Sequence, residues 1–229
     1  SGAIDWRVAD VAVLERETRG PILTGTTEEQ GTEDPTLVAP DVKARFADLC
    51  ARDPAVTWSA LCARIDLIFR TFHRTWAAQE LADVRPLLRD MLFETQRYWI
   101  AAYKAQGPRN VTEDPTIVTT QLSKVTRDAY FDAVTVRVFA SCKDYTLDAA
   151  GKVVGGSRTA ERRYTEYWTL IRSVKTSGPP KSDTGCPNCG APLGSIGMSG
   201  TCASCGAKIT TGDFDWVLSR IEQDEVYRV

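Results

Sequence analysis

The fold is decided by the stretch Ala133-Val134-Thr135-Val136-Arg137-Val138-Phe139-Ala140-Ser141-Cys142-Lys143, which lies within residues 130–146. Its side chains alternate between two kinds, which is typical of a β-strand with one face packed on a core. One face carries small apolar side chains, namely Val134, Val136, Val138, Ala140 and Cys142. The other face carries Thr135, Arg137, Phe139, Ser141 and Lys143. The pattern predicts a long strand within a sheet.

Further strands are expected on both sides of this stretch. Residues 115–127 are rich in Thr, Val and Ile, and residues 158–174 form a third long segment. In that third segment one side carries Tyr164, Glu166, Trp168 and Leu170, and the other Tyr167 and Ile171. Three glycines between Asp148 and Gly156 indicate a hairpin loop. These segments predict an antiparallel sheet.

The chain before residue 107 has helical periodicity instead. Between Thr57 and Gln79 apolar residues recur at three- and four-residue steps, namely Leu61, Ile65, Ile68, Phe69, Phe72 and Trp76. A shorter helix is expected after Pro40, and a third from Arg85-Pro86 to Gly107-Pro108. The face expected to be buried in the third helix consists of Leu88, Met91, Leu92, Thr95, Trp99 and Ala102. Helices followed by antiparallel strands predict an α+β fold.

The two ends of the chain are expected to be separate units. Residues 1–39 are interpreted as a short helix over residues 3–19 and a linker rich in Gly, Pro and Thr. A main domain over 40–176, a small domain over 177–212 and a final helix over 213–229 follow. The final helix would bury Trp216, Leu218 and Ile221 on one side.

The small domain is recognised by its cysteines. Cys186 and Cys189 form one C-x-x-C pair, Cys202 and Cys205 form another, and a glycine follows each pair. Two such pairs at this separation can surround one tetrahedral metal ion, and zinc is the usual occupant. Iron in a rubredoxin-like site is the alternative. Four protein ligands leave no open position for a substrate, so the predicted zinc ribbon has a structural role.

Composition limits the function further. The chain has 229 residues, 43% of them hydrophobic and 25% charged, with a net charge of −2, as in ordinary globular proteins. Neither this charge nor residues 181–212, with Lys181 and Lys208 against Asp183, predict nucleic-acid binding. Seven cysteines, four of them at metal spacing, favour a reducing compartment. The chain contains no run of 18 apolar residues.

Several motifs resemble one known family. They are Ala77-Ala78-Gln79-Glu80-Leu81, Gly107-Pro108-Arg109-Asn110-Val111, Phe131-Asp132-Ala133-Val134-Thr135-Val136, Lys143-Asp144-Tyr145 and Tyr164-Thr165-Glu166-Tyr167-Trp168-Thr169. Over about residues 40–175 the chain resembles the bacterial Tim-forty-four-like proteins, relatives of the C-terminal domain of the peripheral anchor of the mitochondrial inner-membrane import translocase. The cysteine segment and Gly212-Asp213-Phe214-Asp215-Trp216-Val217-Leu218 are similar to the zinc ribbon of bacterial members.

The resemblance implies a nuclear-transport-factor-two-like cone, in which a curved antiparallel sheet wraps helices and leaves a pocket at its open end. It also implies association with a membrane or with translocation machinery, and it carries no catalytic motif. We therefore expect a non-enzymatic module that binds a partner protein, a peptide or a lipid. Membrane association would depend on parts of the parent protein outside this chain. The expected location is the cytoplasm, on the cytoplasmic face of the membrane.

Three residues are predicted to line the pocket: Tyr164, Glu166 and Trp168. A carboxyl group in such a place can have a raised pKa and act as an acid or base, so a small-molecule enzyme is the alternative function. For Glu166 itself, a structural ion pair with Arg137 or Arg163 is the preferred interpretation over the acid–base role. His73, the single histidine, is interpreted as a partly buried structural residue, although it would be a candidate base in an enzyme.

Overall fold

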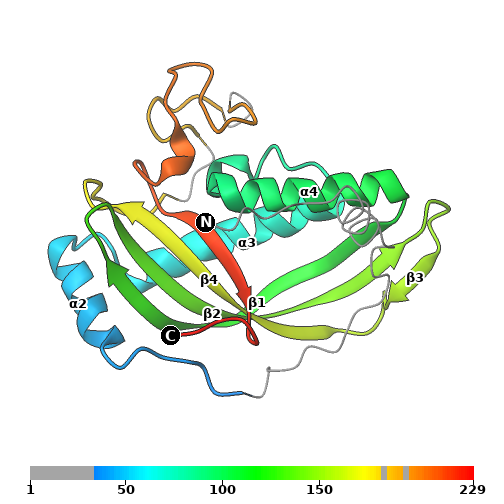
Figure 1. Cartoon of the computed structure of the whole chain (residues 1–229), viewed down its shortest axis with the longest axis horizontal. Helices are drawn as coiled ribbons and strands as arrows, with labels where there is room; N and C mark the ends of the chain where they lie inside the picture. Colours follow the sequence, from blue (N-terminus) through cyan, green and yellow to red (C-terminus); the bar gives the residue numbers. More distant parts are fainter. Residues whose placement is uncertain (1–33, 182–184, 193–195) are drawn as a thin grey trace, which may run out of the picture.

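The structure is a computed structural model that describes residues 34–181, 185–192 and 196–229. It is an α+β fold in which helices come first and a curved antiparallel sheet follows, as predicted (Figure 1). The helix expected over residues 3–19 lies outside the described residues. No helix of the described ranges combines the length and apolar character needed to cross a membrane.

Five strands form the sheet. They are β1 (Arg109–Arg127), β2 (Phe131–Leu147), β3 (Val153–Gly156), β4 (Arg162–Ser173) and β5 (Val217–Gln223). Their order is β1-β2-β4-β5, with β3 paired to β2 at one end. The predicted inner face of β2 is confirmed, because every residue from Val134 to Cys142 at alternate positions is buried. Three register shifts between β1 and β2 accompany the bend of the sheet around the helices.

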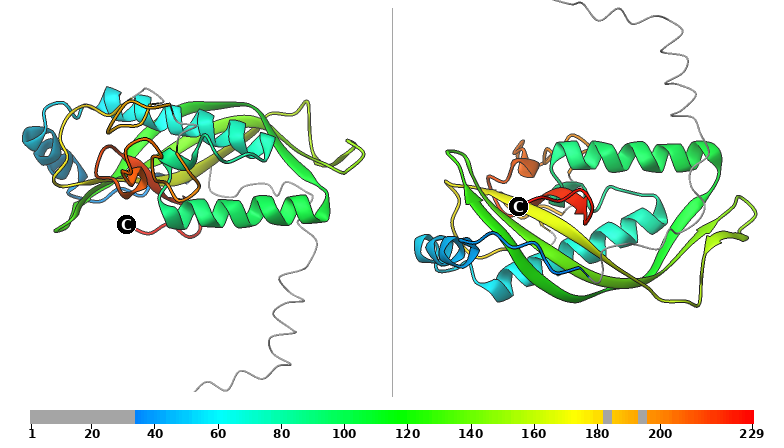
Figure 2. Two further views of the ribbon diagram at one scale, coloured as in Figure 1. Left: turned by 90° about the horizontal axis from the view of Figure 1, so that it is seen from above. Right: turned by 60° about the horizontal axis from the view of Figure 1, so that its bottom comes forward.

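The helices are α2 (Val42–Arg52), α3 (Trp58–Ala78), the 3-10 turn η1 (Arg85–Leu87) and α4 (Asp90–Gln106). Helix α3 begins where the Thr57 hydroxyl accepts a hydrogen bond from the Ala60 amide at 3.1 Å. Its apolar stripe, including Ile65, Ile68 and Phe69, is fully buried in the main core. Helices α3 and α4 lie on the concave side of the sheet (Figure 2).

The prediction for the third helix was partly wrong. Its end was correct, because Gly107 takes a φ of 93° as the residue after α4. Its start was not, because Arg85-Pro86 forms η1, and α4 begins only at Asp90. Its buried face was only partly correct. Leu88 and Leu92 are buried as predicted, but Met91 is 82% exposed and Trp99 45% exposed, and Phe93 and Ile100 are buried instead. The Arg89 amide donates to the Leu218 carbonyl oxygen at 2.9 Å, and this contact with β5 helps to fix which face turns inward.

The helix predicted over 213–229 is wrong, because Val217–Gln223 is strand β5. Trp216 and Leu218 are buried as expected, but β5 pairs with β4, from Glu166 opposite Gln223 to Ile171 opposite Val217. Pairing supplies β4 with hydrogen-bond partners that its edge would otherwise lack. The cysteine-bearing segment is therefore inserted between two neighbouring strands of the sheet.

The described part of the predicted N-terminal linker has neither helix nor strand, yet it lies against the sheet. The Ala39 amide donates to the Ser123 carbonyl oxygen at 2.8 Å, and the Leu37 amide donates to the Tyr167 hydroxyl at 2.9 Å. Near the other end of the chain, the Tyr227 ring stacks on Tyr167 with 3.8 Å between ring centroids. Both segments thus cover the side of the sheet opposite the helices.

Candidate functional site

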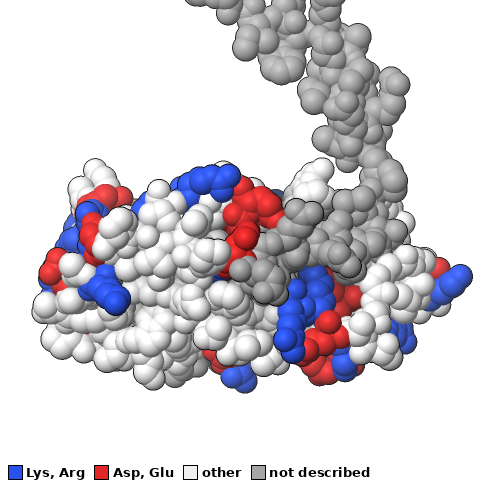
Figure 3. All heavy atoms as spheres, turned by 90° about the horizontal axis from the view of Figure 1, so that it is seen from below, with Lys and Arg blue, Asp and Glu red and all other residues white. Residues whose placement is uncertain are grey.

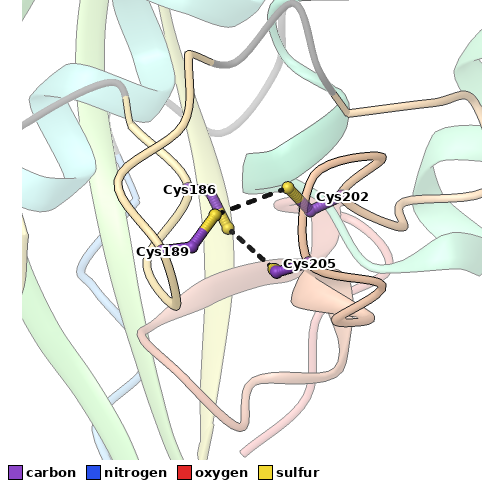
Figure 4. A group of neighbouring side chains, drawn as sticks. All are labelled: Cys186, Cys189, Cys202 and Cys205. Atoms are coloured by element: carbon purple, nitrogen blue, oxygen red, sulfur yellow. Dashed lines mark hydrogen bonds between the residues drawn. The ribbon is translucent and has the colours of Figure 1, made fainter.

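Among the residues that the structure describes, the cysteine cluster is the first candidate site. The sulfur atoms of Cys186, Cys189, Cys202 and Cys205 all lie within 4.8 Å of one another (Figure 4). The Cys186 and Cys205 sulfurs are 3.9 Å apart, as are those of Cys189 and Cys202. Cys186 and Cys202 are buried, whereas Cys189 and Cys205 are exposed to solvent. Four thiolates converging on one point can hold a metal ion.

The two C-x-x-C turns share one geometry. In each turn the glycine after the second cysteine has a positive φ, 74° at Gly190 and 72° at Gly206. Each glycine amide donates to the carbonyl oxygen of the first cysteine, at 2.8 Å in both turns. The Asn188 side-chain amide donates to the Cys205 sulfur at 3.4 Å, and together with the Ala207 amide and the neighbouring thiols it lowers the pKa of the Cys205 thiol to about 6. These hydrogen bonds favour the thiolate, which is the form that binds metals.

The cysteine-bearing segment has little core of its own. Besides Cys186 and Cys202, only Ile196 and Ile209 are buried apolar residues in its described part. So few apolar side chains rarely hold a fold together without a further constraint, and a structural metal ion is a common one. The composition of this core therefore fits a metal-dependent segment.

One acid on the cone anchors this segment. Asp90, in the first turn of α4, accepts hydrogen bonds from Lys208 at 2.8 Å and Thr210 at 2.9 Å, and it also pairs with the buried Arg85. Arg85 in turn donates to the Met198 carbonyl oxygen at 2.6 Å. Burial raises the pKa of Asp90, but these donors outweigh it and hold the pKa well below its usual range. The segment is thus fastened to the start of α4.

A buried ion pair makes a second anchor. The Arg64 guanidinium of α3 lies 3.3 Å from the Asp215 carboxylate, and both side chains are buried. Arg64 also donates to the carbonyl oxygens of Trp216 and Lys181, each at 3.0 Å. The Lys181 amide donates to Asp215 at 2.9 Å, so the chain entering the cysteine segment meets the chain leaving it. The segment is therefore docked on the cone.

The second candidate is a cavity of about 310 Å³ between α3, α4 and the concave face of the sheet. Aromatic side chains form part of its wall and polar side chains form the rest. They are Phe72, His73, Trp76, Gln96, Trp99, Asn110, Thr112, Asp144, Arg162, Tyr164, Glu166, Ile221 and Gln223. Its size lies at the lower end of the range for small-molecule pockets, roughly 300–1,000 Å³.

His73 is held from both sides in this cavity. Its Nδ1 lies 3.0 Å from the Thr112 hydroxyl, and its Nε2 lies 3.0 Å from the Tyr164 hydroxyl. Burial, together with the nearby charge of Arg162, lowers the pKa of His73 to about 4. The imidazole is therefore neutral at neutral pH, when one nitrogen donates and the other accepts. The buried structural role expected for His73 agrees with this geometry.

Two of the three predicted pocket residues line the cavity. Tyr164 and Glu166 are in its wall, whereas Trp168 is fully buried behind it and packs on Phe69, with 5.7 Å between ring centroids. The Trp168 indole donates to Glu166 at 2.9 Å, and the Gln223 side chain donates to it at 3.1 Å. Burial raises the pKa of Glu166.

The ion pair proposed between Glu166 and Arg137 or Arg163 is wrong. Arg137 lies on the other side of the sheet and pairs with Asp224 at 2.9 Å. Arg163 pairs with Glu161 at 3.4 Å. Because neighbouring residues of a strand point to opposite faces, neither arginine shares the face of Glu166.

Sequence reasoning missed the residues that fasten these sites. Asp90 had one usable signal, since acids are favoured in the first turn of a helix. Asp144 and Arg162, which pair at 2.7 Å in the cavity wall, had no signal, because they lie on different strands. Arg64 and Asp215 are separated by most of the chain and had none either.

Comparison with known proteins identifies one family. The Tim44-like domain matches residues 42–180, more than half of the chain. The match begins at α2 and ends just beyond β4, in the chain that leads to the cysteines. No curated protein matches the chain significantly.

Proposed function

The chain belongs to the Tim44-like domain family, and we propose that it is a non-enzymatic binding module associated with protein transport. Its partner is a protein, a peptide or a lipid that enters the cavity of the cone. The observation that carries this proposal is the cavity of about 310 Å³, framed by α3, α4 and the sheet within the matched domain.

The bound metal is proposed to be Zn²⁺, held by Cys186, Cys189, Cys202 and Cys205 in a structural ribbon. Four thiolates suit tetrahedral zinc. The segment buries few apolar side chains, so its fold depends on such a constraint. Elemental analysis of the purified chain should find one zinc per chain, and Cys202→Ser should lower that content. A red protein with one iron per chain would instead support the rubredoxin-like alternative.

The proposed partner is not a nucleic acid. On the face of the molecule in Figure 3, the coloured side chains of both signs are interspersed and much of the surface is uncharged. Nucleic-acid binding rests on clustered cations that neutralise phosphates, and the net charge is −2. A cytoplasmic location, at the membrane face through other parts of the parent protein, completes the proposal, and the metal-ligand spacing of four of the seven cysteines supports it.

A native mass spectrum of protein from its own host tests the binding proposal. A retained mass beyond that of one zinc should be present in the wild type. Gln96→Trp, which fills the cavity from α4, should abolish it. Arg97→Trp adds the same ring one position along, on an exposed part of the helix, and should keep it. Equal retention by both variants would place the binding site elsewhere.

An enzyme is the second candidate, and one arrangement favours it. His73 and Tyr164 are hydrogen-bonded to each other in a cavity that also contains Glu166, so titratable groups converge there. His73→Gln and Glu166→Gln separate the two functions once a ligand is identified. If both variants still bind the ligand but no longer convert it, catalysis would be supported. Unchanged ligand recovered from the wild type supports the binding module.

A further inference from the structure

We propose that the ligand of the cone cavity carries an organic ammonium group, which the Glu166 carboxylate and the aromatic wall receive together. This inference rests on the proposed function, since it names the chemistry of the ligand at the same cavity. It is carried by three observations: the charge inside the cavity, the placement of aromatic rings, and the size of the space.

The charges in the cavity leave one carboxylate available. The charged side chains of its wall are Asp144, Arg162 and Glu166. Arg162 pairs with Asp144 at 2.7 Å, and the Asn110 amide donates to the other oxygen of Asp144 at 2.8 Å. His73 is neutral at neutral pH and adds no charge. The wall therefore holds one more acidic than basic side chain, and Glu166 is the acid that has no ion-pair partner among the described residues.

Within the described part of the chain Glu166 has hydrogen-bond donors but no ion-pair partner, although the nearby charge of Arg162 opposes the rise in its pKa that burial causes. In the described ranges its carboxylate forms no ion pair, and each oxygen accepts one hydrogen bond, from Trp168 or Gln223. A carboxylate can accept about four hydrogen bonds, so two positions remain for a ligand. The Trp168 and Gln223 bonds also hold the carboxylate in place. A positively charged ligand would relieve the unfavourable burial of this charge.

Aromatic rings line the same cavity. The Phe72 and Trp76 rings are stacked, with 6.2 Å between centroids, and the Trp76 indole is anchored by its hydrogen bond to Asn110 at 2.9 Å. Trp99 adds a partly exposed ring from α4. The faces of aromatic rings attract cations, most strongly those of tryptophan. Aromatic rings beside an unpaired carboxylate are the combination that recognises an ammonium ion.

The size of the space excludes large ligands. A cavity of about 310 Å³ accepts a metabolite or one side chain, and its wall is as polar as it is apolar in character. Such a space is unsuited to a pair of acyl chains. The source of the ammonium group is therefore a small free amine or a single amine of a larger partner.

Three probes of the same shape test the proposal by isothermal titration calorimetry at pH 7: 2-phenylethylamine, 2-phenylethanol and 3-phenylpropionate. The ammonium probe should bind at least about tenfold more tightly than the other two. Glu166→Gln should remove that preference. Glu222→Gln, on the neighbouring strand and outside the cavity wall, should keep it.

A second variant keeps Glu166 intact. Gln223→Lys places an ammonium group beside the Glu166 carboxylate within the same chain. This variant should bind the amine probe about tenfold more weakly than the wild type does. Equal or tighter binding of the alcohol or the carboxylate, or no binding of any probe to the folded protein, overturns the proposal. The proposed function is judged separately, by the retained mass in the native spectrum. A competition experiment separates the two sources of the ammonium group. A lysine-containing peptide that displaces the amine probe would indicate an amine of a larger partner, and a small free amine that displaces it would indicate a metabolite.

Discussion

Asp53→Asn is expected to destabilise the protein strongly, because Asp53 neutralises a buried arginine. The Arg172 side chain is 2% exposed and lies 2.8 Å from the Asp53 carboxylate. The same carboxylate oxygen accepts a hydrogen bond from the Gly178 amide at 2.9 Å, and Arg172 donates to the Gly178 carbonyl oxygen at 2.9 Å. The guanidinium also lies 4.9 Å from the centroid of the Trp216 ring. One pair thus joins the end of α2, strand β4 and both ends of the ribbon segment.

The size of the effect follows from burial. Removing one partner of a buried ion pair leaves the other charge uncompensated and costs roughly 3–5 kcal/mol. In a protein of this size about 1 kcal/mol lowers the melting temperature by roughly 2–4 °C, so a fall of about 6–20 °C is expected. Asp48→Asn, one turn earlier on the same helix and exposed, should change the free energy of unfolding by less than about 0.5 kcal/mol.

The pH dependence has a definite sign. Burial raises the pKa of Asp53, but the bonds from Arg172 and Gly178 outweigh it, and the folded-state pKa lies below the ordinary value. The stabilisation is therefore complete above the pKa of this carboxyl in the unfolded chain, which is about 4, and it is lost as the pH falls through the folded-state pKa. Thermal unfolding followed by circular dichroism at pH 7 and pH 3 measures both effects. A melting temperature within 2 °C of the control at pH 7, or a difference that persists in strong acid, would refute the reasoning.

Three further outcomes are expected. Asp90→Asn should lower the free energy of unfolding by roughly 1–2 kcal/mol at pH 7, a value reduced because the carboxylate is half-exposed. The loss should become smaller as the pH falls towards the lowered pKa of Asp90, because the wild-type carboxylate then becomes protonated. Urea unfolding at pH 7 and pH 3 measures both losses, and equal losses would contradict the reasoning. Gly156→Ala should cost more than Gly151→Ala, since both glycines have positive φ but only at Gly156 would a Cβ meet the Asp144 carbonyl oxygen, at 2.1 Å; equal melting temperatures would disprove the close approach. Cys202→Ser should speed amide hydrogen exchange over 196–212 while β1 and β2 stay protected, and exchange unchanged in that segment would argue against a metal-dependent ribbon.

Much of the fold could be predicted because its signals are local. The alternation in β2 and the three- and four-residue steps in α3 each report one buried face, and both faces are buried in the structure. The cysteine pairs could be predicted for the same reason, since a metal site of two C-x-x-C turns is encoded by spacing within each turn. The face of β4 that carries Tyr164 and Glu166 also followed from alternation alone.

Two errors show where local signals end. Trp216 and Leu218 are two positions apart and suit a strand, but with Ile221 they also fit one side of a helix. The unpaired edge of β4 decides for the strand, and that edge exists only in the assembled sheet. In α4 the apolar residues cover more than one face, so the contact of Arg89 with Leu218 was needed to choose between them.

The sequence by itself determined the order of helices α2 to α4 and strands β1, β2 and β4, the inner face of the long strands and the four cysteines of the ribbon. Each of these depends on residues within a few positions of one another, where backbone geometry sets the period. Only the tertiary structure decided the docking of the ribbon through Arg64 and Asp215, the pairing of β5, and the cavity in which His73 meets Tyr164. These contacts join residues about 50 to 150 positions apart, and no local pattern records which distant side chains folding brings together.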